Sequence, residues 1–213
     1  MKKIFMIFSF LCIFVFPEVK IEKGNLEYEG KNFEYIRIEN EFLKITLIPS
    51  LGGRISEIID KSDNLNVVQF GNYGGFLDDH EARTAEKYEY EVIKSSKDLV
   101  SLKLWNEKND VIYKKTITVY SQKPLIEVEY EILNNSQEDL GKIMIRNNFR
   151  PSGEELSDYD IYITPMDYGI IKKSAPYKER ERIGQPWRGF INIKKKKGIC
   201  IYYEDDFLSG FYD

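Results

Sequence analysis

An all-β fold, with antiparallel strands packed as a β-sandwich, is the fold class that the sequence predicts. Short segments of alternating apolar and polar residues recur from about residue 26 onward, and clusters of Gly, Asn, Asp and Pro separate them. No segment carries a sustained apolar stripe with the 3.6-residue period of a helix. A chain of 213 residues is long enough for one substantial core. We therefore expect a single sandwich domain over residues 23–213.

The alternating segments are predicted to be strands, and the residues between them favour tight antiparallel connections. Gly52 and Gly53 allow a sharp reversal, because a backbone with positive φ tolerates no Cβ. Polar breakers at 96–98, 106–110 and 121–124 join later neighbours into a meander. The predicted strands cover residues 33–39, 42–49, 53–60, 88–96, 99–105, 111–120 and 125–133.

Two further stretches complete the predicted elements. Residues 80–89, "HEARTAEKYE", are the one place where a turn or two of helix is expected. Near the end, the basic turn Lys194–Lys197 stands between two apolar strands, and we interpret it as a solvated hairpin tip rather than a polyanion site.

The N-terminus has the architecture of an export signal. Lys2 and Lys3 precede an apolar run over residues 4–16, which is shorter than the roughly 20 residues of a membrane span. We predict that residues 1–22 are an export signal, with an uncleaved anchor as the alternative, so this segment would be the only membrane contact. The mature protein would then be periplasmic, extracellular or at the cell surface. Its one remaining cysteine, Cys200, excludes an intrachain disulfide and is expected to be a buried thiol.

Composition excludes two classes of function. Hydrophobic residues make up 42% of the chain, with 15 Tyr and 13 Phe, which is too much apolar material for a disordered protein. The formal net charge is −4, and the basic run Lys194–Lys197 has no interleaved aromatic residues for base stacking. We therefore expect no nucleic-acid partner.

Three segments resemble the galactose-mutarotase-like (aldose 1-epimerase-like) carbohydrate-binding domains. They are residues 40–70 with the Gly52–Gly53 turn, the hairpin of residues 110–149, and residues 185–212. The resemblance covers about residues 38–213. It implies a β-sandwich, shortened relative to the full supersandwich of that family, and a carbohydrate ligand. The chain is several strands shorter than a full mutarotase, which leaves either a minimal domain or a truncated sequence.

The resemblance also implies where catalytic residues would lie, and this chain departs from it there. Active mutarotases use an acid histidine and a carboxylate base, and Asn147 and Asn148 stand where the histidine is expected. An amide can hydrogen-bond a hydroxyl group but cannot act as a general acid. The base of the family lies beyond the matched region, so catalysis is left open.

The stretch "RNNFRPSGEE" is the strongest candidate for ligand binding. Arg146, Asn148 and Arg150 alternate and would share one strand face, where planar donors suit sugar hydroxyl groups or uronate carboxylates. The alternative is a polar outer face that runs into a turn at Pro151 and Gly153.

The only histidine lies in an acidic loop, and three interpretations of this loop stay open. His80 could be a general acid or base, with Glu81, Asp78 or Asp79 as its partner. The same residues could contact a sugar, or they could form a solvated loop. Consecutive residues rarely all point at one ion, so we expect no metal, and we expect no cofactor.

Three more residues are candidates for substrate binding. Trp187 could stack on a sugar ring or close the end of the sandwich, and Arg188 follows it. We expect Trp187 to lie near the cleft that Arg146, Asn148 and Arg150 would line, and Arg54, which begins the strand after the glycine turn, could point into the same cleft. The sequence thus predicts an exported carbohydrate-binding protein, with a carbohydrate-active enzyme and a secreted structural or interaction module as alternatives.

Overall fold

The computed structural model describes residues 18–69, 75, 78–79, 86–140, 145–166, 169–174 and 187–202. All regular structure in these residues is β, in antiparallel sheets, which confirms the predicted all-β sandwich. The described residues contain no helix that is long and apolar enough to cross a membrane. The helical turn considered for residues 80–89 falls almost wholly outside the described residues, and Glu89 begins a strand.

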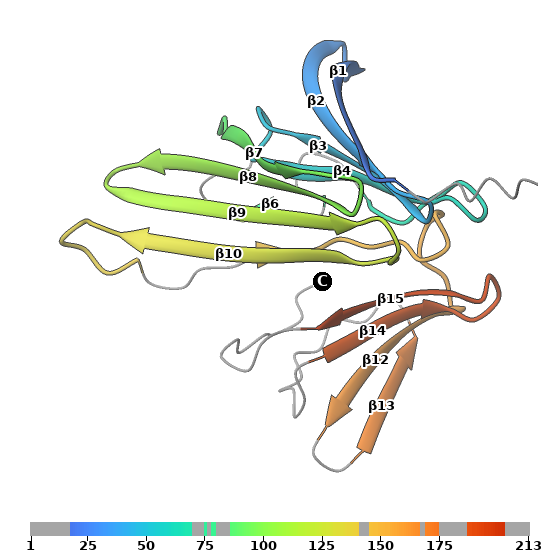
Figure 1. Cartoon of the computed structure of the whole chain (residues 1–213). Helices are drawn as coiled ribbons and strands as arrows, with labels where there is room; N and C mark the ends of the chain where they lie inside the picture. The colour runs from blue at the N-terminus through green and yellow to red at the C-terminus, as the bar shows by residue number, and fades with distance from the viewer. Residues whose placement is uncertain are drawn as a thin grey trace, which may run out of the picture.

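Within the described residues, the strands form three larger sheets and one short ladder (Figure 1). The N-terminal sheet contains, in spatial order, β1 (Lys20–Tyr28), β2 (Lys31–Glu39), β3 (Leu43–Ile48), β4 (Arg54–Asp60) and β5 (Leu65–Asn66). The central sheet contains β10 (Ile126–Asn134), β9 (Val111–Tyr120), β8 (Leu99–Lys108) and β7 (Glu89–Ser95). The C-terminal sheet contains β13 (Gly169–Ser174), β12 (Asp160–Met166), β14 (Trp187–Asn192) and β15 (Lys197–Tyr202), and the ladder pairs β11 (Ile145–Arg146) with β6 (Asp78–Asp79).

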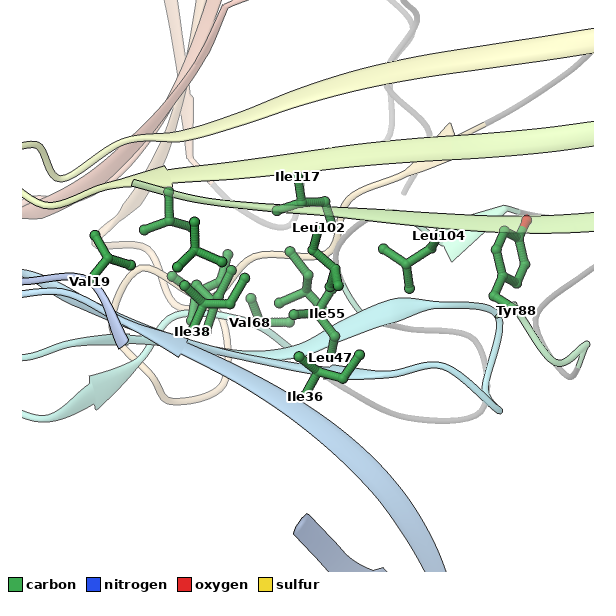
Figure 2. Packing of buried hydrophobic residues seen from close by; sticks show 14 of the residues in the cluster. Val19, Ile36, Ile38, Leu47, Ile55, Val68, Tyr88, Leu102, Leu104 and Ile117 are labelled. Carbon is green, nitrogen blue, oxygen red and sulfur yellow. The ribbon is translucent and has the colours of Figure 1, made fainter. Parts of the chain in front are cut away.

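The main core lies between the N-terminal and central sheets (Figure 2). Alternation along each strand turns one row of aliphatic side chains inward, and these residues have almost no exposed surface. The buried row of the N-terminal sheet is Ile36, Ile38, Ile45, Leu47 and Ile55, and that of the central sheet is Val100, Leu102, Leu104, Ile117 and Val119.

The folded part begins before the boundary predicted between residues 22 and 23. Val19 is 7% exposed and belongs to the main core, and its backbone N–H donates to the carbonyl of Lys97 at 3.3 Å. Strand β1 starts at Lys20 and pairs with β2. Lys and Glu occupy many positions of β1, so its pattern does not show the alternation by which the other strands are predicted.

A second, smaller core belongs to the C-terminal sheet. Tyr162 and Phe190 stack with ring centroids 4.2 Å apart and an interplanar angle of 4°, and Leu156 and Phe149 pack against them. Phe149 also packs against the main core, as does Ile199. These two side chains therefore link the C-terminal sheet to the sandwich.

The exposed thiol of Cys200 contradicts the expectation of a buried one. In β15, Ile199 and Ile201 are half-buried, whereas Cys200 alternates with them and lies on the outer face. The basic turn is solvated at Lys194, Lys195 and Lys196, as predicted.

Lys197, in contrast, holds the C-terminal sheet to the turn after β4. Its Nζ atom donates to the carboxylate of Asp60 and, at 2.6 Å, to Ser62 Oγ. Burial raises the pKa of Asp60, but hydrogen bonds from Lys197 and Ser62 outweigh burial and hold the pKa below its ordinary value. The hydrogen bond with Asp60 raises the pKa of Lys197 in turn.

This junction predicts a pH-dependent loss of stability. Because the pKa of Asp60 is lowered by folding, the pair stabilises the fold above the unfolded pKa of about 3.9 and ceases to do so as pH falls through the folded pKa. Asp60→Asn should lower the unfolding free energy at pH 7 by about 0.2–1 kcal/mol. The difference from wild type should vanish near pH 2, as measured by urea unfolding. Asp63→Asn is the control and should lower the unfolding free energy less than Asp60→Asn does, because Asp63 lies 3.4 Å from Lys197 Nζ and is more exposed. If the effect of Asp60→Asn persists at pH 2, the carboxylate charge is not its cause.

Candidate functional site

Residues 145–150, which we call the crossing segment, lie beside part of the acidic loop. Strand β11 pairs with β6 so that Arg146 stands opposite Asp78 and Ile145 opposite Asp79. The backbone N–H of Asn148 then donates to the carbonyl of Gly75 at 2.9 Å. Two stretches that the sequence offered as separate candidates are therefore neighbours in space.

The second half of the crossing segment pairs with the residues after β5. Gln69 donates its backbone N–H to the carbonyl of Asn148 at 3.1 Å, and Arg150 donates to that of Val67 at 2.8 Å. Between them, Phe149 stands opposite Val68 and packs into both cores. Because neighbouring side chains of an extended strand point to opposite sides, Asn148 and Arg150 point away from the Phe149 side. The side chain of Arg146 lies outside what the structure describes.

Arg150 is the most unusual residue of this segment. Its side chain is half-buried, and its Nε atom is buried without a hydrogen-bond partner. The described part of the chain provides no ion pair or hydrogen bond to its guanidinium group. Leaving a buried donor unsatisfied costs about 1–3 kcal/mol, and more for a charged group, so such an atom calls for an explanation.

A tight turn fixes the backbone at Arg150. Pro151 and Ser152 are buried, and Gly153 donates its N–H to the carbonyl of Arg150 at 2.8 Å. Gly153 has a φ of 70°, and a Cβ at this position would lie 2.4 Å from Leu65 Cδ1. Only glycine tolerates both the positive φ and the close approach of Leu65. The turn predicted at Pro151 and Gly153 therefore packs against the N-terminal sheet.

Arg54 is placed at the other glycine turn and is buried. Gly52 and Gly53 both have positive φ, at 76° and 57°, which confirms the predicted reversal. Arg54 is 3% exposed and donates from Nε to the carbonyl of Leu51 at 2.7 Å. Because Arg54 has so little exposed surface, its side chain is placed to stabilise the glycine turn and not to contact a ligand in this conformation.

Lys115 belongs to the same region and was not a candidate in the sequence. It is fully buried on β9, with Nζ donating to the carbonyl of Gly52 at 2.8 Å. The same atom lies 4.6 Å from the ring centroid of Tyr88 and 5.7 Å from that of Tyr130. The charge is thus held by a carbonyl and by two aromatic faces. Lys115 fastens the glycine turn to the central sheet.

Trp187 and Arg188 lie on opposite faces of the C-terminal sheet. Arg188 is 2% exposed and shares the inner face with Phe190. Trp187 is half-buried on the outer face, where it stands opposite Tyr202, a residue that is 69% exposed. The sheet therefore turns Trp187 away from the side on which Phe149 packs, and the expected sharing of one cleft by Trp187 and the crossing segment does not follow from this arrangement.

Of the acidic loop, residues 74–84, the structure describes Gly75 and the backbone of Asp78 and Asp79. His80 and Glu81 lie outside the described residues, so the three interpretations of this loop remain predictions. Among the residues that are described, no group of three or more His, Cys, Asp or Glu side chains is arranged to hold a metal ion.

Comparison with known proteins supports the fold alone. No family model matches the sequence, and no curated protein is similar to it. A solved structure of a TPR-domain containing protein from Parabacteroides distasonis is similar, with a TM-score of 0.58 and 11% identity. The match covers 83% of this chain and 41% of that protein, so the chain spans about two fifths of its length. By fold, this chain belongs to the class of antiparallel β-sandwich proteins.

The position of Lys115 predicts a stability effect that its neighbour lacks. Lys115→Met keeps most of the side-chain volume but leaves the carbonyl of Gly52 without its donor, so unfolding free energy should fall by about 1–3 kcal/mol. Lys114→Met is the matched control, because Lys114 lies on the outer face and pairs with Glu131, and it should change stability by less than about 0.5 kcal/mol. Chemical denaturation decides between them; equal effects would mean that Lys115 does not hold the turn.

Proposed function

We propose that the protein is an exported carbohydrate-binding protein in which Arg150 anchors the ligand through a sugar carboxylate. The observation that carries the proposal is the buried, unsatisfied Nε of Arg150, on a side chain that is otherwise half-buried. A protein bears the cost of such an atom more readily where a ligand completes its hydrogen bonds.

The geometry of an arginine side chain favours a carboxylate as the completing group. Guanidinium presents parallel N–H donors that match the two oxygens of a carboxylate, and charge-assisted pairs of this kind are among the strongest hydrogen bonds. Uronic acids carry this group on a sugar ring. The rigid turn at Gly153 and the ladder to Val67 hold the Arg150 backbone, which lowers the entropy lost on binding.

Recognition rather than turnover is the proposed activity. The resemblance to galactose-mutarotase-like domains implies a sugar ligand, and Asn147 and Asn148 stand where it implies an acid histidine. Amide side chains donate and accept hydrogen bonds but transfer no proton near neutral pH.

Binding to a uronate oligosaccharide tests the proposal. Calorimetric titration with tri-galacturonate should show binding that Arg150→Met weakens by about tenfold to a hundredfold, the equivalent of about 1.5–3 kcal/mol for hydrogen bonds to a charged group. Arg150→Lys should also lose most of the affinity, because it keeps the charge but not the fork. The unfolding free energy of Arg150→Met should be unchanged or higher, since the variant removes a buried unsatisfied donor.

Arg37→Met is the control, because Arg37 is an arginine of β2 that already pairs with Glu22 at 2.6 Å. It should bind tri-galacturonate as wild type does. Absence of binding by the folded wild-type protein would overturn the proposal, and so would a loss of stability in Arg150→Met without a loss of affinity. That second result would assign Arg150 to packing and favour a structural module.

Export is proposed from the N-terminal pattern, and the fold limits where a signal could be removed. Cleavage after Val19 would take a core residue from the mature protein, and cleavage after residue 22 would also take the start of β1. When the full chain is expressed in a bacterium, the exported protein should begin at or before Val19, as read from its intact mass. A stable exported form that begins at Gly24 would contradict this expectation.

A further inference from the structure

The outer face of the C-terminal sheet is apolar, and its residues belong to neither of the two cores. Tyr162 and Phe190 define the inner face of this sheet, because they form the small core with Phe149. Alternation along the four paired strands assigns the residues between them to the opposite face. These outward residues, which we call the C-terminal outer face, are Ile161, Ile163, Pro165, Ile170, Lys172, Ser174, Trp187, Gly189, Ile191, Gly198, Cys200 and Tyr202.

The two faces of the sheet invert the usual pattern, in which apolar residues point inward and polar residues point to water. The inner face holds buried polar side chains, each at most 3% exposed: those of Asp160, Thr164, Arg188 and Asn192. On the outer face, by contrast, Ile170 is 59% exposed and Tyr202 is 69% exposed. Contiguous apolar surface is unfavourable in water and marks sites of interaction. The pattern therefore indicates a face that a partner covers.

Two glycines make the centre of the C-terminal outer face flat and aliphatic. A Cβ on Gly189 would lie 3.3 Å from Ile163 Cβ, and a Cβ on Gly198 would lie 2.5 Å from Ile191 Cγ2. In each case the isoleucine stands directly opposite the glycine on the neighbouring strand, so its side chain lies across it. Branched aliphatic side chains on a flat sheet are what two sheets present to each other when they pack face to face.

The size of this face suits a weak but specific contact. Four strands of six or seven residues cover about 20 Å by 20 Å, or roughly 400 Å² per copy. Two such faces together bury roughly 800 Å² of projected area, and somewhat more accessible surface, which is the size of weak, reversible complexes. A reversible association is therefore expected, and not a permanent one.

The chemistry of the C-terminal outer face favours a second copy of the chain as the occupant. Its aliphatic centre offers a sugar no hydrogen-bonding side chain, and the one charged residue of the face, Lys172, gives little attraction for an acidic protein or an anionic membrane. The same face of another copy supplies matching isoleucines. Interfaces of homodimers resemble a core divided between two chains, and this composition resembles that of the main core.

Two-fold symmetry is compatible with the position of the lysine. Lys172 lies on β13, the edge strand farthest from the sandwich (Figure 1). A two-fold axis parallel to the strands places β13 of one copy over β15 of the other, so the two lysines lie at opposite edges of the contact. Like charges then do not meet.

We propose that the protein forms a symmetric dimer in which the C-terminal outer faces of two copies pack against each other. The contact uses a surface that the proposed uronate site does not, because Arg150 lies outside it. The two proposals can therefore succeed or fail independently.

Sedimentation equilibrium of the mature protein tests this proposal. The average mass should rise from that of a monomer toward that of a dimer as the concentration increases through the micromolar range. Ile170→Lys should raise the dimer dissociation constant about tenfold or more, because the contact would bury an unpaired charge. Ile163→Lys, at the centre of the face, should have a larger effect. If Ile163→Lys does not fold, Ile170→Lys decides, since Ile170 is exposed in the monomer.

Ile93→Lys is the matched control, because Ile93 is 51% exposed but lies on β7 of the central sheet. It should dimerise as wild type does, and so should Arg150→Met. The proposal is overturned if the folded wild-type protein stays monomeric over this range, or if Ile170→Lys and Ile93→Lys weaken the dimer equally. A monomer that binds phosphatidylcholine vesicles, and loses this binding in Ile163→Lys, would also overturn it and assign the face to a lipid surface.

Discussion

The packing of the N-terminal sheet on the central sheet is the constraint on which the rest of the molecule depends. Two rows of Ile, Leu and Val side chains meet with almost no exposed surface, and burial of each such side chain contributes about 1.5–3 kcal/mol. This core fixes the positions of Val67 and Val68, which follow β5. The crossing segment pairs with those residues, so the main core also determines where Arg150 stands.

Phe149 connects the main core to the candidate site. Its ring packs in the main core and in the small core of the C-terminal sheet, and the residues on either side of it must therefore point the other way. An arginine held with a buried, unsatisfied Nε lowers stability, and the large core offsets that cost. Residues that lower stability are retained where function requires them, and the uronate site proposed at Arg150 would be such a case.

Local patterns in the sequence account for much of the fold. Alternation predicts β2, β3, β4 and the whole central sheet, and the glycines and polar breakers predict their connections. Strand β1 escapes prediction because charged residues occupy both of its faces, and β12 because it contains Pro165. The sequence of β9 does indicate that Lys115 is buried. Alternate residues of a strand share a face, and Lys115 lies on the same face as Ile117 and Val119.

The candidate site is less predictable, because it depends on pairing between distant segments. Nothing local to Arg146 indicates that Asp78 will stand opposite it, since the register of β6 and β11 follows from the packing of the sandwich. The alternation of side chains along a strand places Trp187 and Arg188 on opposite faces, but it does not show which of them faces the core.

The most direct test of the proposed function is a crystal structure of the mature protein with tri-galacturonate. The proposed function requires a uronate carboxylate within hydrogen-bonding distance of Nε and one Nη of Arg150, and a ligand bound elsewhere while this guanidinium group remains without a partner would contradict it.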